Sequence, residues 1–570
     1  MKTTKNIARL AVTAGLTAAL SFGGVMAPVA MAFAEDAAAT ANGSVTIANV
    51  EGNHTEFDGY QIFKADVATV EGKTVVSNIT WANGSVKAAV EGVIKNEEPT
   101  YKGKTAQDAA DWITSKVTGT NDAYCVGPDN IAYKIAAAVD DLTDKKTTSA
   151  GVASGLEHGY WLFVTDAGTI GDGEAGSSPI FTVVGNTPVK VTEKTGIPTV
   201  EKKIVSDADG KEHDAADSQI GQDVTYNLYG TVAENFDKYD TYFYQFSDQI
   251  SKGLALQDGA KVYLYANKDA AKADLDHAKA TDITNYFTPS TAEAAADGSK
   301  TTTWTCNNLK NVADVTKDSC IVVSYTARIN EHAIVAGTES NNNAVILKYS
   351  NNPMDKDSKG QTPPDTVKDY TYGLRINKVD LGTETKLPNA QFTITTNGDE
   401  KNEQVKYVDD KGKLSTNEVI LKTNGDGVIT LTGLDAGVYT VKEVSAPDGY
   451  TAVDPFTFEI RPTMTDDGPA AGLTRVTGEL KTSQETKVIA GLNDTSAGKV
   501  GDNKLDFKEG TLINTDDGTF NITVGDTKQI NLPLTGLNGV TFTWIAGGAV
   551  LCIGVAHLIR SRKRDDGSEE

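Results

Sequence analysis

Lys378 and Glu443 are two side chains that could do chemistry together, because both are predicted to point into an apolar core. Alternate residues of a strand share a face, which places Lys378 with Ile376 and Glu443 with Val441. Burial favours the neutral, nucleophilic form of a lysine and the protonated form of an acid, which can then move protons. The pair could therefore promote bond formation, or it could be a plain buried ion pair.

The segments around both residues resemble a known type of domain. GLRINKVDLGTETKLPNAQFTI begins at residue 373, and LTGLDAGVYTVKEVSAPDGY begins at residue 431. They are similar to the opening and to the E-box of the collagen-adhesin B-type domains of Gram-positive pilins. The resemblance implies an internal isopeptide bond between Lys378 and an Asn or Asp, with Glu443 as the promoting acid.

The acceptor of this bond is expected on the last strand of the domain. TFNITVGDTKQINLPLTG, from residue 519, resembles the family's ending, in which an Asn commonly stands where this chain has Asp526. Val524 and Asp526 alternate onto one face, whereas Asn521 points the other way. We therefore expect Asp526 as the acceptor, with loss of water instead of ammonia.

A similar arrangement with different residues is predicted in the middle of the chain. In PTVEKKIV, alternation turns Lys202 inward with Ile204. YFYQFSDQISKGL resembles the pilin segment that carries a catalytic aspartate, here Asp248, and AVILKYSNNP resembles the closing strand that ends at Asn351. The resemblance implies a Lys202–Asn351 bond promoted by Asp248. The alternative places Lys202 at the rim and Asn351 in a turn.

A further lysine is expected to join one subunit to the next. The segment that ends in VTEKTGIPTVEKK resembles the end of the first domain of backbone pilins, where a linking lysine precedes the next domain. Lys194 occupies that place and Lys190 is the second choice. The alternative is a solvated linker lysine without such a role.

The C-terminal segment carries three signals in register. The motif Leu532-Pro533-Leu534-Thr535-Gly536 is followed by an apolar stretch at 540–559, long enough to span a bilayer, and by a basic tail at 560–564. This order resembles the cell-wall sorting signal of sortase substrates. The resemblance implies that a sortase cysteine attacks the Thr535 carbonyl and releases Gly536 with the rest of the tail. The alternative is a plain single-span anchor.

The N-terminus is typical of a secretory signal peptide. Basic residues, an apolar Ala-rich stretch and Ala32-Phe33-Ala34 precede the acidic Glu35-Asp36, so residues 1–34 are expected to be removed. The chain then faces an oxidising compartment. Cys306 and Cys320 are expected to close a disulfide-bonded hairpin there, whereas Cys125 is expected to be buried without a partner.

Short alternating runs separated by Gly, Asn, Asp and Pro predict an all-β protein of about three tandem immunoglobulin-like sandwiches. Helical patches are few, at 106–116, 131–141 and 269–278. The expected organisation is a signal peptide at 1–34, an N-terminal pilin domain at 35–196, a middle isopeptide-forming domain at 197–371, a C-terminal collagen-adhesin B-type domain at 372–530 and a sorting signal at 531–570.

The net charge and the spacing of possible ligand residues exclude several classes of partner and cofactor. The formal net charge of −24 argues against nucleic acid. The six histidines show no metal-ligand spacing, and the GxGxxG at 171–176 precedes a strand instead of a phosphate-binding helix. We therefore expect no metal, no cofactor and no enzyme, apart from the single intramolecular bond-forming events.

The sequence predicts a structural shaft subunit of a covalent pilus, secreted, polymerised by a class C sortase and anchored to peptidoglycan. Its expected partners are the sortase, identical subunits, peptidoglycan, and possible accessory pilins and a host surface ligand. Two alternatives are a monomeric wall-anchored adhesin with isopeptide-stabilised stalk domains, and a surface enzyme with an unrecognised site in the first domain.

Overall fold

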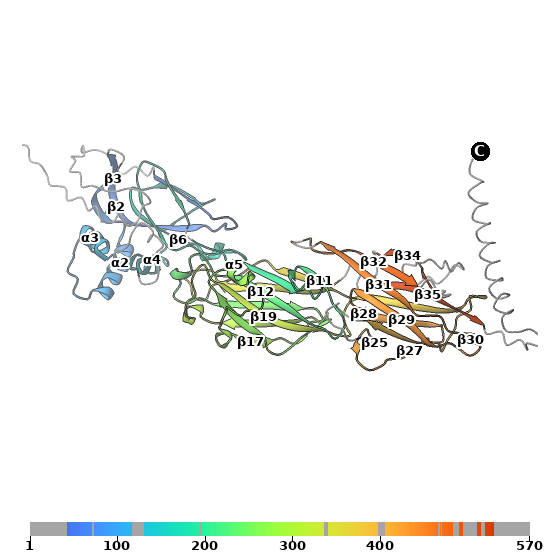
Figure 1. Cartoon of the computed structure of the whole chain (residues 1–570). Helices are drawn as coiled ribbons and strands as arrows, with labels where there is room; N and C mark the ends of the chain where they lie inside the picture. Colours follow the sequence, from blue (N-terminus) through green and yellow to red (C-terminus); the bar gives the residue numbers. More distant parts are fainter. Residues whose placement is uncertain are drawn as a thin grey trace, which may run out of the picture.

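The computed structural model describes residues 43–70, 73–116, 130–193, 195–335, 340–396, 405–465, 468, 470–482, 490–493, 510–514 and 519–528. Figure 1 shows three parts arranged end to end, which we call the N-terminal part (43–193), the middle sandwich (195–371) and the C-terminal sandwich (372–528). Each part has its own sheets and apolar clusters. The prediction of an all-β protein with several sandwiches is confirmed.

The described residues of the N-terminal part form two sheets and three α-helices. One sheet has the order β5 (Val152–Leu156), β1 (Gly43–Ala48), β8 (Val189–Thr192). The other has the order β3 (Lys73–Trp81), β2 (Phe57–Val70), β6 (Gly159–Thr165), β7 (Ile180–Val184), with β4 (Lys146–Thr147) beside β2. The helices are α2 (Gly84–Glu97), α3 (Ala106–Lys116) and α4 (Ile131–Val139).

Strand β6 lies at the centre of this part and is buried along its whole length. Leu162 packs into the cluster formed with the helices, and its neighbour Phe163 packs into the cluster formed with β1. Because alternate residues point to opposite faces, a strand covered on both sides must be apolar throughout. This explains the sequence GYWLFVT.

The middle sandwich has two larger sheets. The first runs β10 (Glu212–His213), β9 (Val200–Val205), β12 (Asp223–Thr231), β19 (Cys320–Ile329), β15 (Lys261–Tyr265), β16 (Thr281–Asp282), with β14 (Leu254–Leu256) beside β19. The second runs β11 (Ala215–Asp217), β22 (Asp365–Tyr370), β20 (Asn341–Ser350), β13 (Tyr244–Ile250), β18 (Lys300–Cys306), β17 (Thr288–Thr291), with β21 (Lys359–Gln361) beside β20. A short helix, α5 (Lys268–Lys272), lies outside the first sheet.

The C-terminal sandwich pairs its first and last strands. One sheet runs β28 (Val428–Leu434), β23 (Tyr372–Asp380), β35 (Thr519–Lys528), β30 (Tyr450–Thr451), with β33 (Ala490–Asn493) beside β35. The other runs β26 (Leu414–Ser415), β25 (Lys406–Val408), β24 (Gln391–Thr396), β29 (Gly437–Ser445), β31 (Phe456–Thr465), β32 (Gly472–Thr482), β34 (Gly510–Asn514), with β27 (Leu421–Lys422) beside β24. β23 and β35 run parallel.

Several predicted features fall outside the described residues: the signal peptide, the LPLTG motif, the apolar segment 540–559, Cys125 and Lys194. Among the residues that the structure does describe, none of the helices has the length and apolar character that crossing a bilayer requires.

Candidate functional site

The C-terminal sandwich brings Lys378, Glu443 and Asp526 together. They come from β23, β29 and β35, and their side chains are completely buried. Lys378 Nζ lies 2.8 Å from Glu443 Oε2 and also contacts Asp526 Oδ1. Glu443 Oε2 additionally accepts a hydrogen bond of 2.9 Å from the Val453 backbone. The amine therefore lies between two carboxyl groups on strands of opposite sheets.

Burial controls the charge of this cluster. Removal from water raises the pKa of Asp526 to about 7; Lys378 opposes this shift and Glu443 adds to it. Glu443 Oε1 and Asp526 Oδ2 are buried without a hydrogen-bond donor among the described residues. A single proton held between the two carboxyl groups would satisfy both oxygens, so the cluster suits a reaction that needs a protonated acid beside a carboxyl acceptor.

The middle sandwich contains a second buried lysine cluster. Lys202 on β9 contacts Asp248 Oδ1 on β13 and Asn343 Oδ1 on β20, and its Nζ lies 3.0 Å from the Tyr325 hydroxyl on β19. All four residues are buried. Desolvation lowers the pKa of Lys202 to about 8, although Asp248 opposes the shift. A neutral amine is therefore accessible near physiological pH.

The predicted acceptor Asn351 is not part of this cluster. Its side chain accepts a hydrogen bond of 2.7 Å from Ser358, and its backbone carbonyl accepts one of 2.5 Å from Gly176 in the N-terminal part. Asn343, eight residues earlier on the strand β20, occupies the expected position instead. Val345, Leu347 and Tyr349 face the core as the alternation predicts, whereas Asn351 lies just past the end of β20 and away from Lys202.

Sequence reasoning missed two members of the middle cluster, although a signal was present for both. Extending the alternation of Leu347 and Val345 backwards reaches Asn343 on the same face. Tyr325 alternates with the buried residues Val323 and Ala327 in CIVVSYTARI. Neither signal identifies a contact with Lys202, because that contact depends on how the two sheets face each other.

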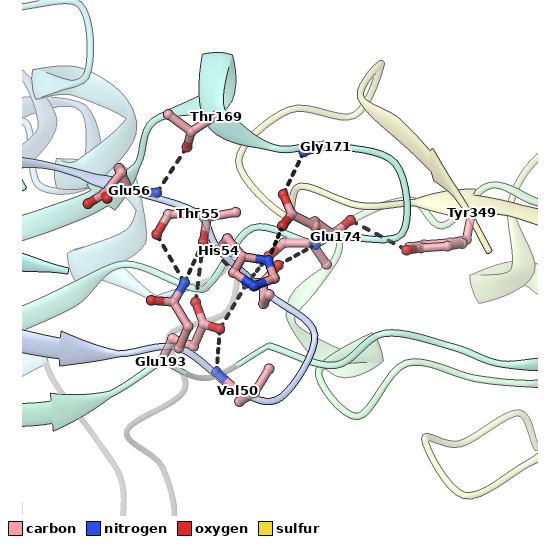
Figure 2. Close-up of polar contacts among 12 residues, drawn as sticks. Val50, His54, Thr55, Glu56, Thr169, Gly171, Glu174, Glu193 and Tyr349 are labelled. Atoms are coloured by element: carbon pink, nitrogen blue, oxygen red, sulfur yellow. Dashed lines mark hydrogen bonds and ion pairs between the residues drawn. The ribbon is translucent and has the colours of Figure 1, made fainter. Parts of the chain in front are cut away.

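The end of the N-terminal part holds a buried acid next to the predicted linking lysine. Glu193 is buried and accepts hydrogen bonds of 2.7 Å from the Val50 backbone, 2.8 Å from Asn53 and 3.3 Å from Thr55 (Figure 2). Two residues later the chain is again fixed, since Thr195 donates a hydrogen bond to the Gly176 carbonyl. The runner-up Lys190 is exposed on β8.

The junction between the N-terminal part and the middle sandwich lies beside this acid. The Tyr349 hydroxyl donates a 3.4 Å hydrogen bond to the Glu174 carbonyl, and the Glu174 carboxylate lies 2.8 Å from His54 Nδ1 (Figure 2). The backbone of Asn351 accepts from Gly176 at the same place. The expected acceptor Asn351 therefore belongs to the contact between two parts of the chain.

The predicted Cys306–Cys320 disulfide is wrong: both thiols are free and buried. Cys306 lies on β18 and points into the main core of the middle sandwich. Cys320 lies on β19 of the other sheet and packs in the outer cluster with Ala271. The chain crosses from one sheet to the other between them, so it does not form the hairpin that the spacing suggested.

No group of three or more His, Cys, Asp or Glu side chains suited to a metal is found in the part of the chain that the structure describes.

Comparison with known proteins identifies relatives. Residues 373–469 match the family model of the SpaA prealbumin-like fold domain. The trypsin-resistant surface T6 protein of Streptococcus pyogenes serotype M6 is 25% identical over 417 residues, which cover 65% of this chain and 70% of that protein.

Solved structures include the T6 backbone pilin of S. pyogenes serotype M6, with 18% identity, a TM-score of 0.48, and coverage of 85% of this chain and 98% of that one. The full-length major pilin SpaD of Corynebacterium diphtheriae has 15% identity, a TM-score of 0.42, and coverage of 86% and 98%. The predicted resemblance to Gram-positive backbone pilins is confirmed by the match of residues 373–469 to the SpaA prealbumin-like fold domain and by the similarity of the chain to the T6 surface protein.

Proposed function

We propose that this chain is the backbone subunit of a covalent surface pilus of a Gram-positive bacterium. The observation that carries the proposal is the pair of buried lysine clusters, Lys202 with Asp248 and Asn343, and Lys378 with Glu443 and Asp526. Each joins a strand near the start of a sandwich to one near its end, so that a covalent bond there would carry tension past the rest of the sandwich. The relationship to the T6 protein supports the same function.

In each cluster the lysine forms an amide bond with its acceptor during maturation. The Nζ of Lys378 attacks the carboxyl carbon of Asp526, Glu443 supplies and recovers the protons, and one water leaves. The Nζ of Lys202 attacks the side-chain carbonyl carbon of Asn343, and one ammonia leaves. Folding holds the reacting groups together, which replaces a slow bimolecular step. These are single events, so the chain is not an enzyme that turns over.

Polymerisation uses the two ends of the chain. A class C sortase cleaves between Thr535 and Gly536, and the Thr535 carbonyl is transferred to the Nζ of Lys194 in the next subunit. The final subunit is transferred to peptidoglycan, so the fibre is secreted and wall-anchored. The fibre supports adhesion through accessory pilins or a host surface ligand. The buried Glu193 supports the choice of Lys194, because it holds the chain in place directly before that lysine.

The test is a denaturing immunoblot of muramidase-released wall material from cells carrying Lys194→Ala, Lys190→Ala or the control Lys211→Ala, whose side chain is 74% exposed. We expect a ladder resistant to boiling for the wild type, Lys190→Ala and Lys211→Ala, and its loss for Lys194→Ala. A single wall-linked band in the wild type would instead favour a monomeric adhesin. Loss of the ladder in Lys190→Ala, with a ladder retained in Lys194→Ala, would assign the linking role to Lys190.

A further inference from the structure

Tyr325 lies at the centre of the middle lysine cluster. Its hydroxyl is 3.0 Å from Lys202 Nζ and 2.7 Å from Asn343 Nδ2, and it also contacts Asp248 Oδ2. It comes from β19 in the first sheet, whereas Asp248 and Asn343 come from β13 and β20 in the second. One hydroxyl therefore touches both reacting nitrogens and the promoting acid.

The ring of Tyr325 is held rigidly in this position. It stacks on Tyr226, with centroids 5.5 Å apart, and on Trp304, with centroids 5.4 Å apart. Only 3% of the residue is exposed. Burial raises the pKa of Tyr325 well above its ordinary value, so the hydroxyl keeps its proton. A group fixed in this way needs no reorganisation when the reaction takes place.

The two oxygens of Asp248 face different groups. Oδ1 contacts Lys202 Nζ, and Oδ2 contacts the Tyr325 hydroxyl. Within the described residues, the structure gives Asp248 no direct hydrogen bond to Asn343 Nδ2, the nitrogen that must leave. The acid therefore reaches the nucleophile directly and reaches the leaving nitrogen through Tyr325.

We propose that Tyr325 is a catalytic residue of bond formation in the middle sandwich and passes a proton from Asp248 to the departing nitrogen of Asn343. The inference rests on the proposed internal bond. The lone pair of Lys202 Nζ forms a bond to the Asn343 side-chain carbonyl carbon. The step starts with Asp248 protonated and Nζ neutral; Tyr325 gives its proton to Nδ2 and takes one from Asp248 Oδ2, and the bond from carbon to Nδ2 breaks to release ammonia. Asp248 Oδ1 then accepts a proton from Nζ, so both promoting groups end as they began.

The C-terminal cluster explains why only one sandwich needs the hydroxyl. There Glu443 and Asp526 both contact Lys378 Nζ, so the acid lies beside the acceptor carboxyl group without a bridging hydroxyl. The aromatic ring over Lys378 Nζ belongs to Phe392, which has no hydroxyl. An amide nitrogen must be protonated to leave, and in the middle sandwich it is separated from the acid by one hydroxyl group.

The experiment follows bond formation in full-length ectodomain made by cell-free translation, quenched in acid denaturant at intervals and analysed by mass spectrometry. Tyr325→Phe should slow the loss of ammonia from the middle sandwich on the order of 100-fold, within the range of general acid–base catalysis. The matched control is Tyr244→Phe, because Tyr244 is fully buried in the same core and donates its hydroxyl to the Thr231 carbonyl. The control should react at the wild-type rate.

The C-terminal sandwich of the same molecules provides an internal reference, since its loss of water should be unchanged. Loss of ammonia at the wild-type rate in Tyr325→Phe would overturn the role of Tyr325 while leaving the internal bond intact. A wild-type chain that never loses ammonia would instead overturn the proposed bond itself. The two failures are therefore distinguishable.

A second measurement covers the case in which Tyr325→Phe does not fold. Fluorinated tyrosines placed at position 325 keep the ring and the hydroxyl but make the hydroxyl more acidic. If Tyr325 donates to the leaving nitrogen, the rate should rise with the acidity of the phenol. A rate independent of that acidity would assign Tyr325 a purely structural role.

Discussion

The amine of Lys202 lies against the side-chain amide of Asn343, and these two residues come from strands of opposite sheets. The contact joins β9, near the start of the middle sandwich, to β20, near its end. Asn351 lies eight residues further along the chain, just past the end of β20, and contacts Ser358 instead. This contact distinguishes Asn343, on β20, from Asn351, which follows the strand.

Asn343→Ala should abolish the loss of ammonia from the ectodomain, whereas Asn351→Ala should leave it unchanged. The physical reason is that only Asn343 places a carbonyl carbon next to the Lys202 amine. Intact-mass analysis of both variants beside the wild type checks this. A normal mass deficit in Asn343→Ala would mean that another acceptor reacts with Lys202.

Lys378→Ala should retain the mass of one water and should lower the free energy of unfolding of the C-terminal sandwich by about 5 kcal/mol, from the loop-closure entropy of a covalent link between residues 148 positions apart. Intact mass and denaturant titration measure the two effects. Lys442→Ala is the matched control, because Lys442 lies on the same sandwich but points to solvent. Equal stability of the two variants would show that no such link forms.

Stability should fall as the pH rises from about 4 to about 8, because of carboxyl groups near the junction of the two sandwiches. Burial raises the pKa of Asp217 to about 6 and that of Asp369 to about 8. The native state therefore holds more protons than the unfolded state in this range, and each group lowers the free energy of unfolding by up to about 1.4 kcal/mol per pH unit. Melting temperatures measured between pH 5 and pH 8 test the slope.

One substitution isolates the contribution of Asp369 to this pH dependence of stability. Asp369 is fully buried on β22 and accepts a 3.1 Å hydrogen bond from the Tyr226 hydroxyl. Asp369→Asn removes the ionisation and should flatten the slope between pH 6 and pH 8. Asp237→Asn, at a side chain that is 61% exposed, should leave the slope unchanged. A slope that survives Asp369→Asn would point to another buried carboxyl group such as Asp435, whose pKa burial also raises.

Cys306 and Cys320 should both react with an alkylating agent in denaturant without prior reduction. In the native protein at pH 8 they should resist it, because burial raises the pKa of Cys306 and raises that of Cys320 to about 12. Mass spectrometry of an ectodomain that ends before the apolar segment 540–559, and so lacks Cys552, and that carries Cys125→Ser counts the two labels. A denatured, unreduced chain that takes up neither label would establish the disulfide after all.

Alternation along strands predicted much of the candidate site. It predicted that Lys378, Glu443 and Asp526 point into one core, and the structure brings these three side chains into contact. It failed at Asn351 because alternation determines the face of a residue but not its partner in the next strand. The pairing of β13 with β20 sets Asp248 opposite Val345, which puts Asn343 near Lys202 and carries Asn351 to the far end.

Two other features depended on long-range packing. The spacing of Cys306 and Cys320 suggested a hairpin, but it contains no information on which sheet each strand joins. Helix α2 was not predicted, although Val86, Val90 and Ile94 recur every four residues and are buried on one face. The helical spacing of these buried residues was therefore present in the sequence, but the segment is short and was not recognised as a helix.

The parallel pairing of β23 with β35 has a mechanical consequence. Gly373 lies opposite Thr519 and Asp380 lies opposite Asp526, so the chain enters this sandwich at one end of the pair and leaves at the other. A pull on the two ends therefore slides the strands lengthwise past each other. The evenly spaced hydrogen bonds between them are then loaded in shear and must break together, whereas an antiparallel pair pulled from one end would unzip bond by bond.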